Sequence, residues 1–275
     1  MKALSRPARS TAAGSARPGT ARSPRAWALA GALAGGLLTL VLAAPAHWLA
    51  AGLERASQGQ LQLREPRGTV WTGSARLVLT GGAGSRDQLA LPSRVQWQLR
   101  PAWLGARIQL SAACCTPQPL QARLRLRWQG LEAQFQDQQS QWPADLLTGL
   151  GTPWNTAQIQ GQLLLRTQGL RLQWLAGRGR SEGQLQLDAL GVSSRLSTLR
   201  PMGSYRLVID GGDSPTVTLS TLEGHLQLSG SGQWVGQRLR FRGEATATPE
   251  REAALANFLN IIGRRSGARS LISLG

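Results

Sequence analysis

The sequence of 275 residues is poor in the side chains on which most enzymes and metalloproteins depend. It has two histidines, two cysteines, one tyrosine and a single lysine, Lys2. Zinc sites, iron–sulfur clusters, haem ligation and histidine-based hydrolytic triads each need more ligands or a free base. A Walker phosphate loop and a dinucleotide fingerprint are also lacking. The sequence therefore predicts that the protein is not an enzyme, with no catalytic residue, no metal site and no cofactor.

Acidic residues are scarce as well. Asp and Glu number 14 against 31 Lys and Arg, which gives a formal net charge of +17. Only 16% of the residues are charged and 41% are hydrophobic, so the chain is not a disordered polyelectrolyte and can bury a core. The 33 glycines, 14 prolines and 10 tryptophans indicate a turn-rich chain.

The N-terminal part predicts a membrane anchor. Residues 1–25 carry six basic and no acidic residues, which predicts a disordered basic cytoplasmic tail. Residues 26–53 contain no charged residue, and Trp27 and Trp48 bracket an interval of 21 residues. As a helix this interval spans roughly 30 Å, the thickness of the bilayer hydrocarbon core. We therefore expect a single transmembrane helix over 26–53, surrounded by membrane lipid, with Trp27 and Trp48 as membrane-interface anchors.

The basic tail sets the expected orientation. By the positive-inside rule the protein is single-pass in the cell inner membrane, with a cytoplasmic N-terminus and residues 54–275 in the periplasm. The alternative is a cleaved signal peptide, since Ala44-Pro45-Ala46 fits the small-x-small cleavage pattern. The apolar stretch continues past that site through Ala51, which favours the anchor. Both alternatives place the main domain outside the cytoplasm.

Beyond residue 55 apolar residues alternate with Gln, Arg, Ser and Thr. A period of two predicts half-buried antiparallel strands. Glycine precedes many of these runs, which we interpret as a turn before each strand. Residues 54–275 are therefore expected to be mainly β, a meander-like curved antiparallel sheet of about 10–12 strands. The glycines that lead such runs are Gly59, Gly161, Gly169, Gly183, Gly224 and Gly236.

Two segments depart from the alternation. The residues from Pro143 to Leu150 have leucines at helical spacing and predict a short helix. A C-terminal α-helix is predicted from Thr248, as N-cap, to Gly263. Its apolar face consists of Leu255, Phe258, Leu259 and Ile262.

The apolar face of the predicted sheet must be covered. We favour a second layer formed by the same sheet folding back on itself. The alternative is an open, curved apolar trough that takes up acyl chains or a strand of a partner. The opposite face carries arginines such as Arg123, Arg125 and Arg127. A location outside the cytoplasm argues against nucleic acid as their partner and favours anionic lipid head groups or acidic protein surfaces.

The histidines and cysteines have a structural interpretation. His47 falls in the anchor, and His225 is expected on the surface of a strand. Cys114 and Cys115 are adjacent and could form a vicinal disulfide, pair between chains or stay free. We favour a structural bridge, because no base lies near to activate a thiol.

Five motifs follow one another in a fixed order: Gly68–Ala75, Gly149–Thr156, Pro201–Arg206, Leu222–Gly230 and Asn257–Arg265 with the tail to Gly275. Together they resemble the type II secretion system protein N family (general secretion pathway protein N), from the anchor to the C-terminus. The sequence departs from the family pattern in its long basic tail and in His225, where a proline is expected.

The resemblance implies a bitopic inner-membrane protein with a periplasmic β-rich domain, an accessory and non-enzymatic part of the machinery that exports folded proteins across the outer membrane. Its implied partners are other inner-membrane subunits of that machinery. From the residues we expect a non-catalytic scaffold that contacts them through an exposed strand edge or the arginine-rich face. The alternative is a lipid-binding or lipid-conducting periplasmic module, similar to AsmA-like proteins, with an apolar trough.

Overall fold

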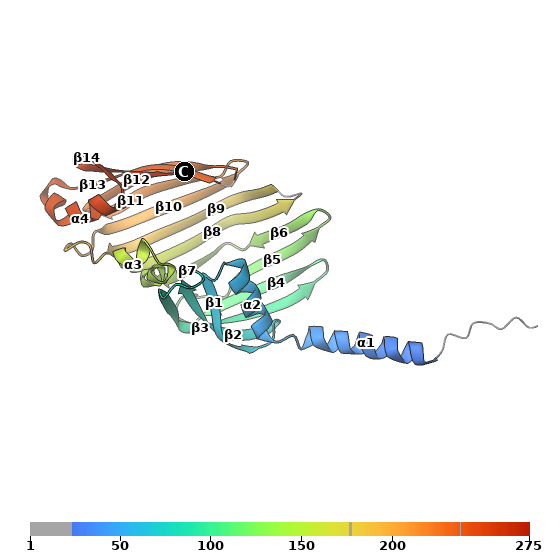
Figure 1. Cartoon of the computed structure of the whole chain (residues 1–275). Helices are drawn as coiled ribbons and strands as arrows, with labels where there is room; N and C mark the ends of the chain where they lie inside the picture. The colour runs from blue at the N-terminus through green and yellow to red at the C-terminus, as the bar shows by residue number, and fades with distance from the viewer. Residues whose placement is uncertain (1–23, 176–177, 237) are drawn as a thin grey trace, which may run out of the picture. The chain divides into compact units, whose positions relative to one another are not determined.

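The computed structural model describes residues 24–175, 178–236 and 238–275. The chain divides into two compact units, Met1–Ala43 and Ala44–Gly275. Within the described residues the first unit consists of helix α1 (Pro24–Leu42) and Ala43, and the second contains all other elements (Figure 1). The predicted basic tail, residues 1–25, lies outside the described residues except for Pro24 and Arg25, with which α1 begins.

The prediction of one continuous helix over residues 26–53 is wrong. Helix α1 ends at Leu42, and a second helix, α2 (Ala46–Ala56), begins after Pro45. Proline has no N–H to donate, and it disfavours helical backbone in the residue before it, so the helix stops short of Ala44. None of the described helices is both long enough and apolar enough to cross a membrane.

Helix α2 belongs to the sheet unit. It packs against the first two strands, and the buried Ala46 contacts the cluster formed by Ala75 and Trp97. Val70 donates its backbone N–H to the carbonyl oxygen of Ala44 over 2.8 Å. The second unit therefore begins at Ala44, and Ala44 and Ala46 are buried in it.

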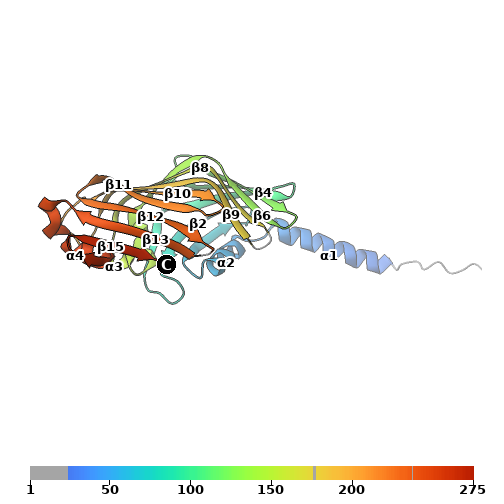
Figure 2. The same ribbon diagram turned by 90° about the horizontal axis from the view of Figure 1, so that it is seen from above.

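Within the described residues fifteen strands form one antiparallel sheet (Figures 1 and 2). The strand order follows the sequence except that β7 pairs with β8 beside β6, and β15 lies between β13 and β14. The predicted antiparallel meander with a C-terminal helix is confirmed, but the expected number of strands was too low. The strands are β1 (Leu61–Gly68), β2 (Thr72–Thr80), β3 (Gln88–Ala102), β4 (Gly105–Ala112), β5 (Leu120–Arg127), β6 (Gly130–Phe135), β7 (Gln138–Pro143), β8 (Gln160–Leu175), β9 (Arg178–Ser193), β10 (Gly203–Gly212), β11 (Thr216–Gly224), β12 (Leu226–Val235), β13 (Arg238–Ala247), β14 (Arg264–Ser266) and β15 (Arg269–Leu274).

The sheet is strongly curved, with its helices on the concave side (Figure 2). Strands β1 and β14 end the strand order and do not pair with each other in the described part of the chain, so the sheet is open. The second layer that we favoured from the sequence does not form over the middle strands, where Leu126 and Trp174 stay exposed. The alternation itself is confirmed, because Leu165, Leu187, Leu207 and Leu219 stand in register on one face across β8 to β11.

The longest strands, β8 and β9, share a bulge at which both bend. Their register shifts between Gln168 and Arg171, where Gly169 and Gly183 have φ of +57° and +83°. A Cβ atom on Gly183 would collide with the carbonyl oxygen of Gly169. Our interpretation of these two glycines as turns is therefore wrong: each lies inside a strand, and the bulge adds curvature. The extra residue also explains why the apolar positions of β8 change from odd to even numbers.

Helix α4 (Glu252–Ile262) covers the concave face of the C-terminal strands. Leu255, Phe258 and Leu259 are buried against residues that include Tyr205 and Leu226, so the predicted apolar face is confirmed. Thr248 is the N-cap residue of a 3₁₀ turn, η2 (Pro249–Arg251), that runs into α4, so the predicted position is confirmed, but its side chain makes no capping hydrogen bond. The hydroxyl of Thr248 instead contacts Nδ1 of His225 over 3.1 Å.

The short helix predicted between Pro143 and Leu150 is confirmed as a 3₁₀ helix, η1 (Ala144–Leu150). Its Leu146 is buried against Leu91 and Val95 of β3. A further turn of helix, α3 (Trp154–Ala157), follows it. Helices α2 and η1 thus cover the N-terminal end of the strand order, as α4 covers the C-terminal end.

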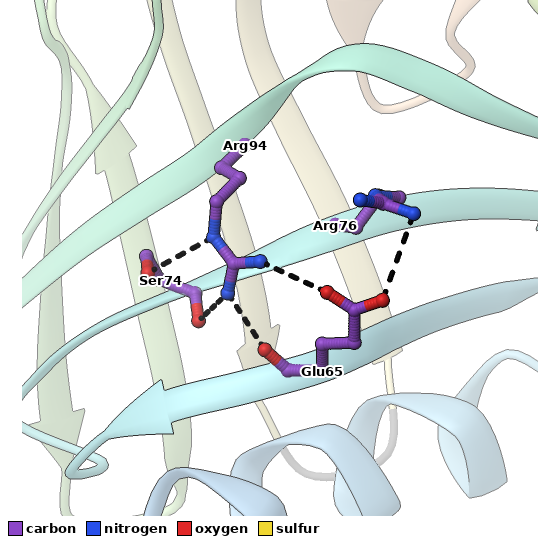
Figure 3. Close-up of polar contacts among 4 residues, drawn as sticks. All are labelled: Glu65, Ser74, Arg76 and Arg94. Atoms are coloured by element: carbon purple, nitrogen blue, oxygen red, sulfur yellow. Dashed lines mark hydrogen bonds and ion pairs between the residues drawn. The ribbon is translucent and has the colours of Figure 1, made fainter.

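Both edges of the sheet are shaped against further strand pairing. Edge strand β1 bulges at Glu65, whose φ is +49°. Arg94 reaches from β3 across β2, donates from Nη2 to the Glu65 carbonyl oxygen over 2.7 Å and from Nε to the Ser74 hydroxyl over 3.3 Å (Figure 3). Arg76 lies 3.6 Å from the Glu65 carboxylate. At the other edge β14 has only three residues.

The packing of α4 leads to the first prediction. Replacing the fully buried Leu259 with alanine leaves a cavity and should lower the free energy of unfolding of the full chain by about 2–5 kcal/mol in urea denaturation. Ile261→Ala is the matched control, because Ile261 is exposed on the same helix. Equal losses in the two variants would contradict the packing of α4 on the sheet.

Candidate binding groove

The concave face carries an apolar hollow over strands β4 to β9. Its volume is about 360 Å³, and it lies between the regions covered by η1 and by α4. Two polar members of its wall are already engaged, since Thr167 donates to the Gln136 carbonyl oxygen over 2.8 Å and Ser140 accepts from the Trp142 indole. Its apolar lining consists of Ile108, Leu110, Leu120, Ala122, Leu124, Phe135, Leu165, Leu170 and Leu185.

A second hollow, of about 770 Å³, continues the first toward the β8–β9 and β12–β13 hairpins. The two hollows share Leu170 and Leu185, and we call them together the groove. At the mouth of the second hollow Arg180 pairs with Asp213 over 3.3 Å. The rest of its wall is mainly apolar and includes Leu172, Trp174, Ile209, Pro215, Trp234 and Val235.

The groove exists because the helices leave the middle of the sheet uncovered. In the described part of the chain the buried clusters lie under α2, η1 and α4. Between them Leu126 and Trp174 stay exposed on the apolar face. An apolar concavity of this size suits a long aliphatic chain or an apolar peptide segment.

The convex face carries a row of arginines at the same strands. Arg107 of β4 stands directly opposite Arg100 of β3 and Arg123 of β5. All three are exposed, and in the region described none of them has a carboxylate partner. Like charges directly opposite each other on neighbouring strands are destabilising. We call these three residues the arginine row. An anion that binds there from outside the chain would offset the repulsion between them.

A buried ion pair holds the convex face together in the middle of the sheet. Asp188 of β9 is 3% exposed and accepts two hydrogen bonds from Arg206 of β10, over 2.7 and 2.9 Å. These bonds hold the pKa of the Asp188 carboxyl below its ordinary value, against the opposing effect of burial. Arg166 adds a weaker contact at 3.9 Å. The pair lies on the face opposite the groove and is structural.

The cysteines lie at the end of the sheet opposite the β3–β4 and β5–β6 hairpin tips. Cys114 and Cys115 form a disulfide in the β4–β5 turn. Cys115 is buried beside Leu146, and its carbonyl oxygen accepts the N–H of Gln141 from β7 over 2.8 Å. We infer a structural role for the disulfide. It attaches the β4–β5 turn to β7, whose side facing β5 is incompletely paired.

The predicted interface tryptophans lie on different units. Trp27 is exposed on α1, whereas Trp48 is half exposed on α2, where its ring meets the edge of His47. The 21-residue interval between them is therefore not one helix. Their role as membrane anchors stays a prediction.

Sequence reasoning gave an apolar trough only as the alternative to a second layer, and it missed the alignment of the arginine row. The change from odd to even apolar positions between Leu165 and Leu170 was a visible signal of a bulge, and so of one long bent strand. The alignment of Arg100, Arg107 and Arg123 depends on the lengths of two turns, which periodicity does not give.

Comparison with known proteins gives one family. The family model for type II secretion system (T2SS), protein N matches residues 59–271, which is more than half of the chain. No curated protein and no solved structure matches the chain. The matched residues span the sheet from the turn before β1 into β15.

The Asp188 pair gives a prediction on acid stability. Because the folded-state pKa of Asp188 is depressed, its contribution is present above the unfolded-state pKa of about 3.9 and is lost as pH falls through the folded-state value. Asp188→Asn should cost about 1.5–3 kcal/mol at neutral pH, and this difference from wild type should shrink below about pH 4. Urea denaturation across pH measures it, with the exposed Asp213→Asn as control. A difference that is independent of pH would contradict the assignment.

Proposed function

Because the chain belongs to the type II secretion system protein N family, we propose that it is an accessory inner-membrane component of that system and acts as a non-catalytic scaffold. Family membership makes it a component of type II protein secretion with other components of the system as partners. In this proposal the chain is held at the inner membrane by its N-terminal segment, with the N-terminus in the cytoplasm and the sheet unit in the periplasm. Residues 54–275 then act as one rigid β domain.

The observation that carries the scaffold proposal is the uncovered groove. An apolar surface of this kind, when exposed to solvent, marks a site that another molecule covers. The strand edges that we expected as contacts are less suitable, because β1 is bulged and β14 is short. We therefore assign the groove to an apolar segment of another secretion subunit.

The second candidate function is favoured by the lining of the same groove. Its inner hollow offers aliphatic and aromatic side chains and few free hydrogen-bonding groups, which suits acyl chains better than a peptide backbone. In this candidate the protein holds or conducts phospholipid in the periplasm.

Site-specific photo-cross-linking in cells should distinguish the two. Leu124 and Leu172 are both cross-strand neighbours of Ala133 and line the groove. A benzophenone amino acid at either position therefore faces the groove. The scaffold proposal predicts adducts with another secretion subunit, identified by mass spectrometry. The same label at Leu222 or Leu271, exposed elsewhere, should give none. Adducts with phospholipid alone would reject the scaffold assignment of the groove and support the second candidate.

Lipid analysis tests the second candidate directly. If the groove holds acyl chains, the purified full chain should retain phospholipid that mass spectrometry detects after detergent exchange. The double variant Leu124→Asn, Leu172→Asn should lose most of it, because amides in the groove leave unpaired polar groups beside the acyl chain. Leu222→Asn, Leu271→Asn is the matched control and should retain it. Equal retention in both double variants would contradict the candidate.

A further inference from the structure

Two neighbouring hairpins expose tryptophan at their tips. Trp103 in the β3–β4 tip is 95% exposed and Trp128 in the β5–β6 tip is 99% exposed. Leu104 and Leu126 beside them are exposed as well. Large apolar side chains gathered in this way on a soluble surface mark a contact with another phase or molecule.

These tips lie at the end of the sheet where the chain enters the second unit. Strands β3 and β5 run toward the tips and β4 runs away from them, so the tips are separated by two strand spacings, roughly 10 Å. Pro45 forms a β-bridge with Thr69, just beyond the end of β1. Strand β1 runs in the direction of β3, so Ala44 and the two tips share one end of the sheet, opposite α3 and α4 (Figure 1).

The arginine row stands next to the tips. Arg100 and Arg107 face each other across β3 and β4, a few residues from Trp103, and Arg123 follows on β5. The described structure places no acidic side chain against them. Three adjacent guanidinium groups form a site for phosphate, which arginine binds with two parallel hydrogen bonds.

We propose that this end of the sheet unit docks on the surface of an anionic phospholipid bilayer. Trp103 and Trp128 insert into the boundary between head groups and acyl chains, where tryptophan is favoured because its ring is apolar and its N–H is polar. The arginine row binds lipid phosphates beside the inserted tips, and anionic head groups offset the mutual repulsion of the arginines. The patch combines apolar tips with unpaired cations. An anionic phospholipid surface matches both, because it offers acyl chains and phosphate groups together.

Docking orients the sheet unit so that its strands point away from the membrane surface. Strands β8 and β9 have 16 residues each, so they extend roughly 50 Å from the membrane surface. The larger hollow of the groove then opens near the bilayer, since its wall includes Trp174 and Val235 at the same end. This inference does not depend on which guest the groove takes.

The experiment uses the full chain reconstituted into nanodiscs that contain brominated phosphatidylcholine, with or without phosphatidylglycerol. Bromine quenches the fluorescence of tryptophans that reach the lipid. We expect more quenching with phosphatidylglycerol, and a clear loss of the quenched fraction in Trp103→Phe, Trp128→Phe. Trp154→Phe, at the opposite end of the sheet, should leave the quenched fraction unchanged. Because Trp27 is present in every variant, any quenching of the N-terminal helix cancels in the comparison.

A second pair of variants tests the arginine row. Arg100→Gln, Arg107→Gln, Arg123→Gln should abolish the extra quenching that phosphatidylglycerol causes. Arg195→Gln, Arg200→Gln, Arg251→Gln removes the same charge from exposed positions at the far end and should preserve it. Unchanged quenching in the Trp103, Trp128 variant would show that the tips stay in water and would overturn the proposal. Equal effects of the two arginine variants would show that net charge alone explains the attraction to phosphatidylglycerol. That result would overturn the assignment to the arginine row.

Discussion

The structure depends on the need to cover one apolar face of a single curved antiparallel sheet. Alternation at period two places leucines in register on one side and arginine or glutamine on the other. Helices α2 and η1 cover one end of the strand order and α4 covers the other. The middle strands are left with an apolar floor, so the same pattern that stabilises the ends of the sheet creates a site in its centre.

The two faces of the same strands carry complementary chemistry. Leu124 of β5 lines the groove, and its neighbours Arg123 and Arg125 project from the convex face. A change of one residue in the register of β5 would exchange these faces. The lengths of the β3–β4 and β4–β5 turns therefore matter for the arginine row and for the groove alike.

Local patterns predicted the elements that depend on local physics. The apolar face of α4, the η1 turn and the antiparallel meander follow from periodicity and turn residues, and all three are present. The break at Pro45 is also local physics, because proline lacks the N–H that would continue the helix, although the same residue fits a cleavage pattern. The sequence does not distinguish a bulge from a turn at Gly169 and Gly183, because both place glycine at positive φ. Which residues meet across strands depends on register, and no short window of sequence contains it.

The order of the strands also bears on how the chain reaches this fold. Nearly every strand pairs with the one before it in the sequence, so most of the sheet forms through short-range contacts. Loop-closure entropy is small for such neighbours, and a low contact order favours rapid folding. A polypeptide delivered from its N-terminus can therefore add hairpins one after another as they emerge. Among the described strands β14 is an exception, because it precedes β15 in the sequence but pairs only with it and must wait for β15 to dock on β13.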